Sequence, residues 1–371
     1  MTPVEAGHAL FEPFRLRHLR LRNRVVMAPM TREASSDGVP TKAMIDYYAR
    51  RAAGGVGLII TEGTTVPHAA ARNRSGVPVF HGDDSLAQWS DLVAAVHAEG
   101  AAIMPQLWHV GMDRKIGDPP DPMVPPAGPS GLDLHGSAMG RPMTRADIDD
   151  IVRAFASAAR DAERTGFDGI ELHGAHGYLI DQFLWSRTNR RTDEYGGDIV
   201  RRSRFAADLI RECRSAVSAD FPIIFRLSQW KITDFSARLA ESPAELEQIV
   251  SLLADAGVDA FHCSTRRYWL PEFPGSELTL AGWVRKITGL PTIGVGSVGL
   301  QNSEFTSTLL DGVGAEVDGV ARVADHLSRG EFDLVCVGRA LISDPSWVNK
   351  IAQGRSEELL PFDAGDLAKL Y

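Results

Sequence analysis

Two histidines and a tyrosine stand close together directly after a short apolar segment. Asp168–Leu172 has the apolar character of a buried strand, and His173, His176 and Tyr178 follow it at once. Imidazole and phenol groups can hydrogen-bond a carbonyl or another acceptor oxygen, and each can also hold a proton for transfer. The spacing therefore predicts a site at the end of this strand that binds an oxygen atom and places a proton donor beside it.

A metal site is the alternative interpretation of the same histidines. His109, His173 and His176 could act as ligands, because neutral imidazole binds zinc and related metals. A metal-dependent barrel hydrolase would also need carboxylates at its strand ends, and these are sparse, with Glu62 as the main candidate. We therefore expect no metal at this site.

Eight short apolar runs occur along the chain, and each of them ends in small or polar residues. Continuous apolar strands are typical of a parallel sheet, in which both faces are covered. The runs are Arg24–Pro29, Val56–Glu62, Ala102–Trp108, Gly169–His173, Ile223–Ser228, Ala260–Thr265, Thr292–Ser297 and Leu334–Arg339.

Helical patterns separate these runs. Apolar residues recur at helical spacing in Ser85–Glu99, and Thr144–Thr165 opens with a Thr-Arg-Ala-Asp capping signal. Ser242 offers an N-cap, with Pro243 at the first helical position. Repeated strand-then-helix units predict an α/β fold, a (β/α)8 TIM barrel. A doubly wound fold usually has fewer strands and a glycine-rich first turn, which is absent after Pro29.

The remaining segments predict additions to a single barrel. Phe11–Arg24 alternates loosely, and we expect it to form a hairpin cap before the first barrel strand. Long strand-to-helix loops are expected at Gly111–Met143, Trp230–Glu241 and Arg266–Leu280, on the side where barrel active sites are built. The sequence has no internal repeat and no sign of a second domain, so we expect one domain over residues 1–371.

The composition is that of an ordinary globular protein, with 44% hydrophobic and 23% charged residues. The formal net charge of −9 argues against binding to nucleic acid or to an anionic membrane surface. Met1–Leu10 has no basic segment followed by an apolar one, so we expect no signal peptide. Cys213, Cys263 and Cys336 are far apart and are expected to be buried thiols in a reducing compartment. These features predict a cytoplasmic protein, and a homo-oligomer is compatible with them.

The carboxyl ends of the strands of a parallel barrel share one mouth, so the residues there can bind one ligand. Amide and hydroxyl groups such as those of Gln106 and Thr31 suit a heteroaromatic ring. Glycine turns at Gly296 and Gly338 let backbone N–H groups approach an anion, and Arg339 offers a planar fork of donors for phosphate. We therefore expect a planar, phosphorylated cofactor.

Several longer motifs occur together, each at an expected strand. The strongest are His173-Gly-Ala-His-Gly-Tyr-Leu-Ile-Asp-Gln-Phe-Leu184 and Asn189-Arg-Arg-Thr-Asp-Glu-Tyr-Gly-Gly197. Others are Arg24–Arg32, Gln106–Gly111 and Val337–Pro345. With these motifs, which run through nearly the whole barrel, the chain resembles the Old Yellow Enzyme family of flavin-dependent ene reductases.

The resemblance implies FMN bound without a covalent link. Thr31 and Gln106 would hydrogen-bond the flavin ring, and Arg226 would stabilise the anionic reduced ring. The phosphate would be bound by Gly296, Ser297, Gly338 and Arg339. Backbone contacts to the ring would come from residues at the ends of the first two strands, namely Pro29, Met30 and Gly63.

The resemblance also implies a reaction in two halves. NAD(P)H would reduce FMN, and an α,β-unsaturated carbonyl or nitro compound would then accept hydride from flavin N5. His173 and His176 would bind the activating oxygen of the substrate, and Tyr178 would protonate the α-carbon. Further substrate contacts are expected from aromatic residues in or near the long loops, namely Trp108, Tyr268 and Trp269.

The sequence departs from the family at His262–Phe273, which is unlike the best-known members. This segment carries Arg266 and Arg267, which could hold a substrate carboxylate, so oxidative N-demethylation of a small amine or betaine is an alternative function. Reduction of nitrate esters or nitroaromatics is a closer variant of the same chemistry. A non-catalytic flavin-binding protein is a third alternative. The cysteines form no close cluster, so we expect none of the iron–sulfur members of the family.

Overall fold

The computed structural model describes residues 9–301, 307–308 and 311–371. Most of the N-terminal segment on which the expectation about a signal peptide depends lies outside these residues. In the described part of the chain, no helix has the length and apolar character needed to cross a membrane.

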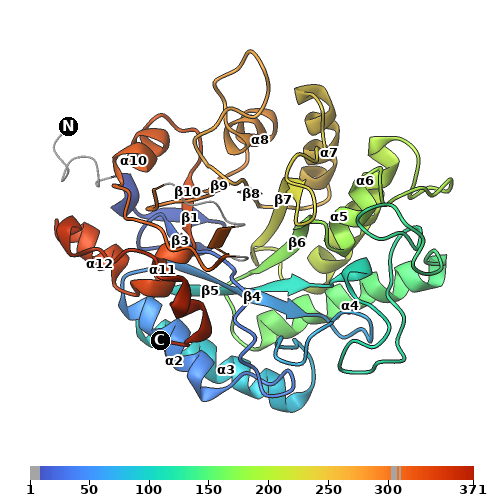
Figure 1. Ribbon diagram of the computed structural model, residues 1–371, viewed down its shortest axis with the longest axis horizontal. Coiled ribbons are helices and arrows are strands. Elements are labelled where there is room, and N and C mark those ends of the chain that lie inside the picture. Colours follow the sequence, from blue (N-terminus) through green and yellow to red (C-terminus); the bar gives the residue numbers. More distant parts are fainter. Residues whose placement is uncertain (1–8, 302–306, 309–310) are drawn as a thin grey trace.

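Eight parallel strands close into a barrel, as the eight apolar runs predict (Figure 1). Neighbouring strands follow the chain order, and the last strand pairs with the first to close the ring. The predicted (β/α)8 TIM barrel is therefore confirmed. The strands are β3 (Val25–Met27), β4 (Leu58–Thr65), β5 (Ala102–Trp108), β6 (Ile170–His176), β7 (Ile223–Lys231), β8 (Ala260–Ser264), β9 (Thr292–Val295) and β10 (Leu334–Val337).

Helices surround the barrel (Figure 1), and two of them begin where their capping residues predict. Thr144 forms a full capping box with Asp147, and Ser242 accepts a hydrogen bond from the backbone of Glu245 with Pro243 in the first turn. The helices are α2 (Lys42–Ala53), α3 (Asp83–Ala98), α4 (Arg145–Arg164), α5 (Leu179–Leu184), α6 (Ile199–Ala216), α7 (Pro243–Asp255), α8 (Leu280–Thr288), α10 (Ala321–Ser328), α11 (Arg339–Ser343) and α12 (Trp347–Ala352), with short 3-10 turns at Gly111–Asp113, Ser356–Glu358 and Ala364–Ala368.

The expected N-terminal hairpin is present and closes the bottom of the barrel. Strands β1 (Phe14–Leu16) and β2 (Leu19–Leu21) pair antiparallel, and their leucines pack against the apolar residues of the barrel interior. The turn between them is held by an ion pair of Arg17 with Asp259, which precedes β8. Because this hairpin covers the amino-terminal end of the strands, the opposite mouth is left for a ligand.

Glu62, near the middle of β4, holds the loop that follows β3. Its Oε2 accepts the backbone N–H groups of Arg32 at 2.9 Å and Glu33 at 3.1 Å, and its Oε1 accepts the Tyr48 hydroxyl. Glu62 is almost wholly buried, and burial raises the pKa of its carboxyl to about 7 despite these hydrogen bonds. The loop after β3 is thus tied to a carboxyl group that titrates near neutral pH.

The packing of the β1–β2 hairpin against the barrel interior predicts that a substitution in the hairpin lowers stability. Leu21→Ala should lower the free energy of unfolding by about 2–5 kcal/mol, because it leaves a cavity in the barrel interior. Leu270→Ala, at a half-exposed position of the β8–α8 loop, is the control and should change it by less than about 0.5 kcal/mol. Urea denaturation followed by circular dichroism measures both. Equal effects of the two substitutions would contradict the packing of the hairpin against the barrel interior.

The raised pKa of Glu62 predicts that replacing this residue changes the stability of the fold by an amount that depends on pH. A carboxyl whose folded-state pKa lies above its unfolded value destabilises the fold progressively as the pH rises from about 4.5 to about 7. Glu62→Gln keeps an oxygen that accepts the two backbone N–H groups but removes this cost, which amounts to about 3 kcal/mol at 1.36 kcal/mol per pKa unit. The melting temperature of the variant relative to wild type should therefore rise between pH 5 and pH 8. A difference that is the same at both pH values would show that Glu62 is ionised without penalty.

Candidate active site

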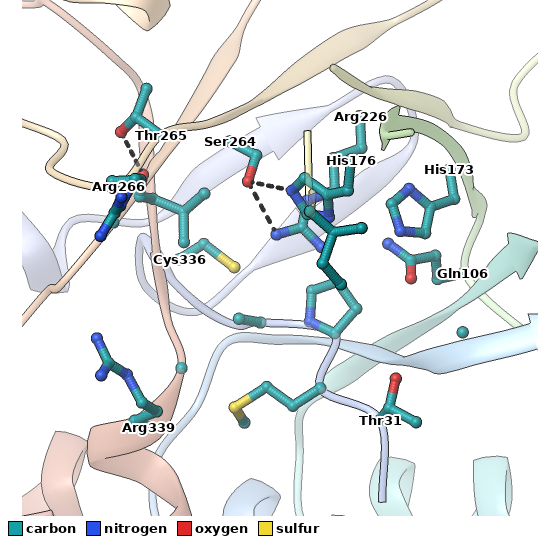
Figure 2. A pocket seen from close by; sticks show the side chains of 18 of the residues that line it. Thr31, Gln106, His173, His176, Arg226, Ser264, Thr265, Arg266, Cys336 and Arg339 are labelled. Carbon is teal, nitrogen blue, oxygen red and sulfur yellow. Dashed lines mark hydrogen bonds between the residues drawn. The ribbon is translucent and has the colours of Figure 1, made fainter. Parts of the chain in front are cut away.

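A cavity of about 430 Å³ lies at the carboxyl-terminal mouth of the barrel. Its walls contain His173 and His176 (Figure 2). Tyr178, and Trp108 from the end of β5, also line it. All ten residues that the motifs predict for the cofactor also line it, namely Pro29, Met30, Thr31, Gly63, Gln106, Arg226, Gly296, Ser297, Gly338 and Arg339. The fold thus brings the predicted reactive and cofactor residues to one cavity.

The two histidines reach this cavity because β6 continues beyond the predicted strand end. Its pairing with β7 shifts register between Gly174 and His176, which is a β-bulge. His176 then has a left-handed backbone with φ of 66°, and Gly177 has φ of 90°. This irregular end of the strand lets His173, His176 and Tyr178 all face the cavity, which a regular strand with alternating side chains would prevent.

The aromatic rings of this group are in mutual contact. The ring of Tyr178 lies edge-on to Trp108 at 4.8 Å and to His173 at 5.0 Å between centroids. The Nδ1 atom of His173 is buried and has no hydrogen-bond partner in the described part of the chain. His176 Nε2 lies 2.8 Å from the Ser264 hydroxyl at the end of β8. The site therefore presents ring nitrogens beside a phenol that aromatic contacts hold in place.

The electrostatic surroundings keep all three groups uncharged near neutral pH. Burial, and after it the positive charge of Arg226, hold the pKa values of His173 and His176 well below the usual histidine range. Burial also raises the pKa of the Tyr178 phenol above its ordinary value. The histidines are thus neutral hydrogen-bonding groups, and Tyr178 retains its proton.

A buried polar chain lies behind the amide of Gln106. Gln106 Nε2 donates to Glu171 Oε1 at 2.8 Å, and Glu171 Oε2 lies 2.7 Å from His262 Nδ1. Because the side-chain nitrogen is engaged by a carboxylate, the amide is oriented with its oxygen available as an acceptor. Sequence reasoning placed Gln106 at the site but not the Glu171–His262 pair that orients it.

Arg226 supplies positive charge inside the barrel. Its side chain is buried, one Nη donates to Ser264 at 3.3 Å, and Nε has no hydrogen-bond partner in the described part of the chain. A buried guanidinium with a donor to spare suits an anionic or strongly polar ligand, because an unsatisfied buried donor is costly. This arrangement fits the electron-rich edge of a flavin ring.

The far end of the cavity has features that suit a phosphate. Gly296 has φ of 143°, and a Cβ there would come within 2.6 Å of the Thr265 carbonyl oxygen, so only glycine fits. Figure 2 shows Arg339 and Arg266 at one end of the view, with His173, Gln106 and Thr31 at the other. Arg339 Nη1 donates to the Thr308 hydroxyl at 2.9 Å. The residues present therefore fit a planar, phosphorylated ligand such as FMN.

Two of the predicted substrate contacts lie elsewhere. Tyr268 and Trp269 are absent from the residues that line the cavity. Tyr268 is buried with its ring edge-on to those of His326 and Phe332, and Trp269 packs under the guanidinium of Arg322. The loop after β8 thus turns these rings toward α10 and the start of β10.

Other cavity residues were not recognised from the sequence. Trp230 stacks on the His176 ring at 4.2 Å with an interplanar angle of 25°, because β7 extends beyond its predicted end at Ser228. Ser264 belongs to a predicted strand end and could have been identified from that position. The ion pair of Arg74 with Glu33 joins two loops that nothing in the sequence places together.

No group of three His, Cys, Asp or Glu side chains in the described residues is arranged to hold a metal ion. His109, the third histidine of the alternative metal site, instead contacts His68, with 3.0 Å between Nε2 and Nδ1. All three cysteines are free and buried.

Comparisons with known proteins agree with this geometry. Residues 9–358 match the model of the NADH:flavin oxidoreductase / NADH oxidase family. The chain is 37% identical over 362 residues to an NADH oxidase of Thermoanaerobacter brockii, covering 94% of this chain and 52% of that protein. It is 32% identical to an NADPH dehydrogenase of Halalkalibacterium halodurans, covering 93% of this chain and 94% of that protein.

A solved structure of morphinone reductase in complex with tetrahydroNAD has the same fold, with a TM-score of 0.80 and 28% identity over 96% of this chain and 93% of that one. The chain spans about half the length of the NADH oxidase and of a metal reductase from Desulforamulus reducens that it also matches. The matches extend along the barrel that carries the cavity, and the chain belongs to the NADH:flavin oxidoreductase / NADH oxidase family, the Old Yellow Enzyme family that its motifs predict.

Proposed function

We propose that this protein is an FMN-dependent NAD(P)H oxidoreductase that reduces carbon–carbon double bonds activated by a carbonyl or nitro group. The observation that carries the proposal is the convergence of His173, His176 and Tyr178 on the cavity that Gln106 and Arg226 also line. The family and its named reductases support the general class of reaction. The substrate class rests on the chemistry of the histidines and the tyrosine.

The residues that would hold FMN are those that fit it on physical grounds. Gln106 would bond polar edge atoms of the ring through its oriented amide, and Thr31 would add a hydroxyl on the side of the β3 loop. Arg226 would lie at the edge that gains negative charge on reduction, and Arg339 would bind the phosphate. When bound, FMN accepts hydride from NAD(P)H and passes it to the substrate.

The two histidines would bind the activating oxygen of the substrate. Because their pKa values are held well below the usual range, they act as neutral N–H donors. Donors aimed at an oxygen that gains negative charge stabilise the transition state more than the ground state. Arg226, which together with the larger effect of burial keeps the histidines neutral, adds a positive field in the same region.

Tyr178 would supply the proton. Its raised pKa keeps the phenol protonated over the whole physiological range, and its edge contacts with Trp108 and His173 limit its rotation. Trp108 on one side and Trp230 on the other enclose the histidines in apolar surface. Exclusion of water strengthens each hydrogen bond to the substrate oxygen.

Oxidative N-demethylation is the alternative function suggested by Arg266 and Arg267, which could hold a substrate carboxylate. Arg266 lines the cavity, and its guanidinium stacks on Phe235 at 4.2 Å, whereas Arg267 is outside the cavity lining. Arg266 lies toward the Arg339 end of the cavity in Figure 2, away from His173, so it gives this alternative no support. Reduction of nitroaromatics or nitrate esters would use the same histidine pair.

An anaerobic absorbance titration separates these functions. NADPH or NADH should bleach the flavin band of the purified protein, and 2-cyclohexenone should then restore it. Recovery with a nitrate ester but without recovery by enone would favour the second reductase activity, and reduction of the flavin by an N-methyl amino acid would favour the demethylase. A colourless protein that FMN cannot reconstitute would refute the proposal.

Tyr178→Phe should separate the two half-reactions. Loss of the phenol proton should slow reoxidation of the flavin by 2-cyclohexenone by about 100-fold or more, the usual range for a general acid. Reduction of the flavin by NAD(P)H, which needs no proton from Tyr178, should change by less than about threefold. Stopped-flow absorbance at the flavin band measures both rates.

Tyr195→Phe is the matched control. Tyr195 is a buried tyrosine whose hydroxyl donates to Asp208 at 3.0 Å, and it does not line the cavity. Both half-reactions should keep their wild-type rates in this variant. Equal loss of both half-reactions in Tyr178→Phe would remove Tyr178 from the role of proton donor.

A further inference from the structure

A fully buried ion pair lies beside the site and has no part in the chemistry described above. Lys231 Nζ, at the end of β7, lies 2.8 Å from Asp181 Oδ1 in α5, and both side chains have no exposed surface. Burial of two charges costs several kcal/mol per ion before their attraction is counted, so such a pair adds little net stability compared with apolar residues. The pair is therefore better explained by the segments of backbone that its two side chains hold in place.

Asp181 holds the turn between the reactive residues. Its second oxygen accepts the backbone N–H of Gly177 at 2.6 Å, and Gly177 stands between His176 and Tyr178. The same turn is closed by a hydrogen bond from Tyr178 N to the Ala175 carbonyl oxygen at 3.3 Å. The carboxylate thus fixes the Gly177 N–H, one of the two peptide N–H groups that lie between the imidazole and the phenol.

Lys231 belongs to the strand end that holds His176. It pairs with His176 in the β6–β7 ladder, and the next residue, Ile232, donates its N–H to the His176 carbonyl oxygen at 3.1 Å. Ser228 Oγ accepts the His176 N–H at 3.0 Å, and Trp230 stacks on the imidazole. The end of β7 therefore holds both the backbone and the ring of His176.

We propose that the Lys231–Asp181 ion pair is a positioning pair that joins the end of β7 to α5 and fixes the His176–Gly177–Tyr178 turn. The inference rests on the proposed function, since it assigns the pair the task of setting the distance between the oxygen-binding imidazole and the proton-donating phenol. His176 has a left-handed backbone that a non-glycine residue adopts only under constraint. Without the pair, the turn is free to relax, and a displacement of about 1 Å costs about 100-fold in rate.

Two double variants separate the hydrogen bond from the charges. Asp181→Asn with Lys231→Met removes both charges but keeps an oxygen that accepts the Gly177 N–H. Asp181→Leu with Lys231→Met removes the acceptor as well, at similar volume. Single substitutions are avoided because each would leave one buried charge without its partner. Asp344→Asn with Lys350→Met is the control, since it removes both charges of a largely buried Lys–Asp pair whose atoms are 2.9 Å apart, and neither residue lines the cavity.

Three measurements on the FMN-loaded proteins test the inference. Hydrogen–deuterium exchange of the peptide spanning Gly174–Tyr178 should be accelerated most in the Leu/Met variant and to a smaller extent in the Asn/Met variant, which loses only the link between β7 and α5. Exchange of this peptide should be unchanged in the control variant. Reoxidation of the flavin by 2-cyclohexenone should slow by about 100-fold in the Leu/Met variant and by less than about 10-fold in the Asn/Met variant. Affinity for FMN should stay within about twofold of wild type in all of them, because no cofactor residue is altered.

A coupling experiment distinguishes positioning from a general loss of structure. In a Tyr178→Phe background the Leu/Met substitutions should slow enone reduction by less than about 10-fold, because the proton donor that they position is already absent. Equal losses with and without Tyr178 would overturn the inference, as would a Leu/Met variant with wild-type turnover.

Wild-type exchange data keep the inference testable if the Leu/Met variant does not fold. The Gly174–Tyr178 peptide should then exchange as slowly as peptides of the barrel strands, and exchange at the rate of an exposed loop would overturn the inference. Failure of the proposed function is distinguishable, because 2-cyclohexenone would then not reoxidise the flavin of the wild-type protein.

Discussion

Closure of the parallel barrel is the constraint on which the rest of the structure depends. It directs the carboxyl ends of all eight strands to one mouth, while the β1–β2 hairpin fills the other end. Alternate residues of each strand face the interior, so Glu171 and His173 on β6 share a face with Arg226 and Ser228 on β7. The polar groups of the site are therefore brought together by strand register, and the loops need only enclose them.

Each charged group in the barrel interior has defined polar partners. Glu171 contacts both Gln106 and His262, and its charge also faces Arg226. Arg226 in turn is among the causes that keep His173 and His176 neutral. A single guanidinium thus favours negative charge on a bound ligand and prevents the neighbouring imidazoles from competing for protons. Replacement of either charge would alter several groups together.

Most of the fold could be predicted from the sequence, because the strands are buried on both faces and appear as continuous apolar runs. The caps at Thr144 and Ser242 fix helix starts through local hydrogen bonds, and these were also predictable. The extended ends of β6 and β7 were not, since the bulge at His176 and the pairing of Lys231 depend on contacts between strands. The direction of the loop after β8 depends likewise on tertiary packing, so the contacts of Tyr268 with His326 and Phe332 could not be predicted.

The site residues that sequence reasoning missed share one physical property, which is that they act on other residues. Ser264 bonds to His176 and to Arg226, and Trp230 stacks on His176 while its indole N–H donates to the Ser264 carbonyl oxygen at 3.2 Å. None of these side chains belongs to a motif whose chemistry can be named in isolation. A left-handed histidine costs about 1–3 kcal/mol, and that cost is met by several hydrogen bonds and a stacked ring contributed by β7, β8 and α5. The histidines define what the site can do, and the surrounding residues determine where the histidines stand.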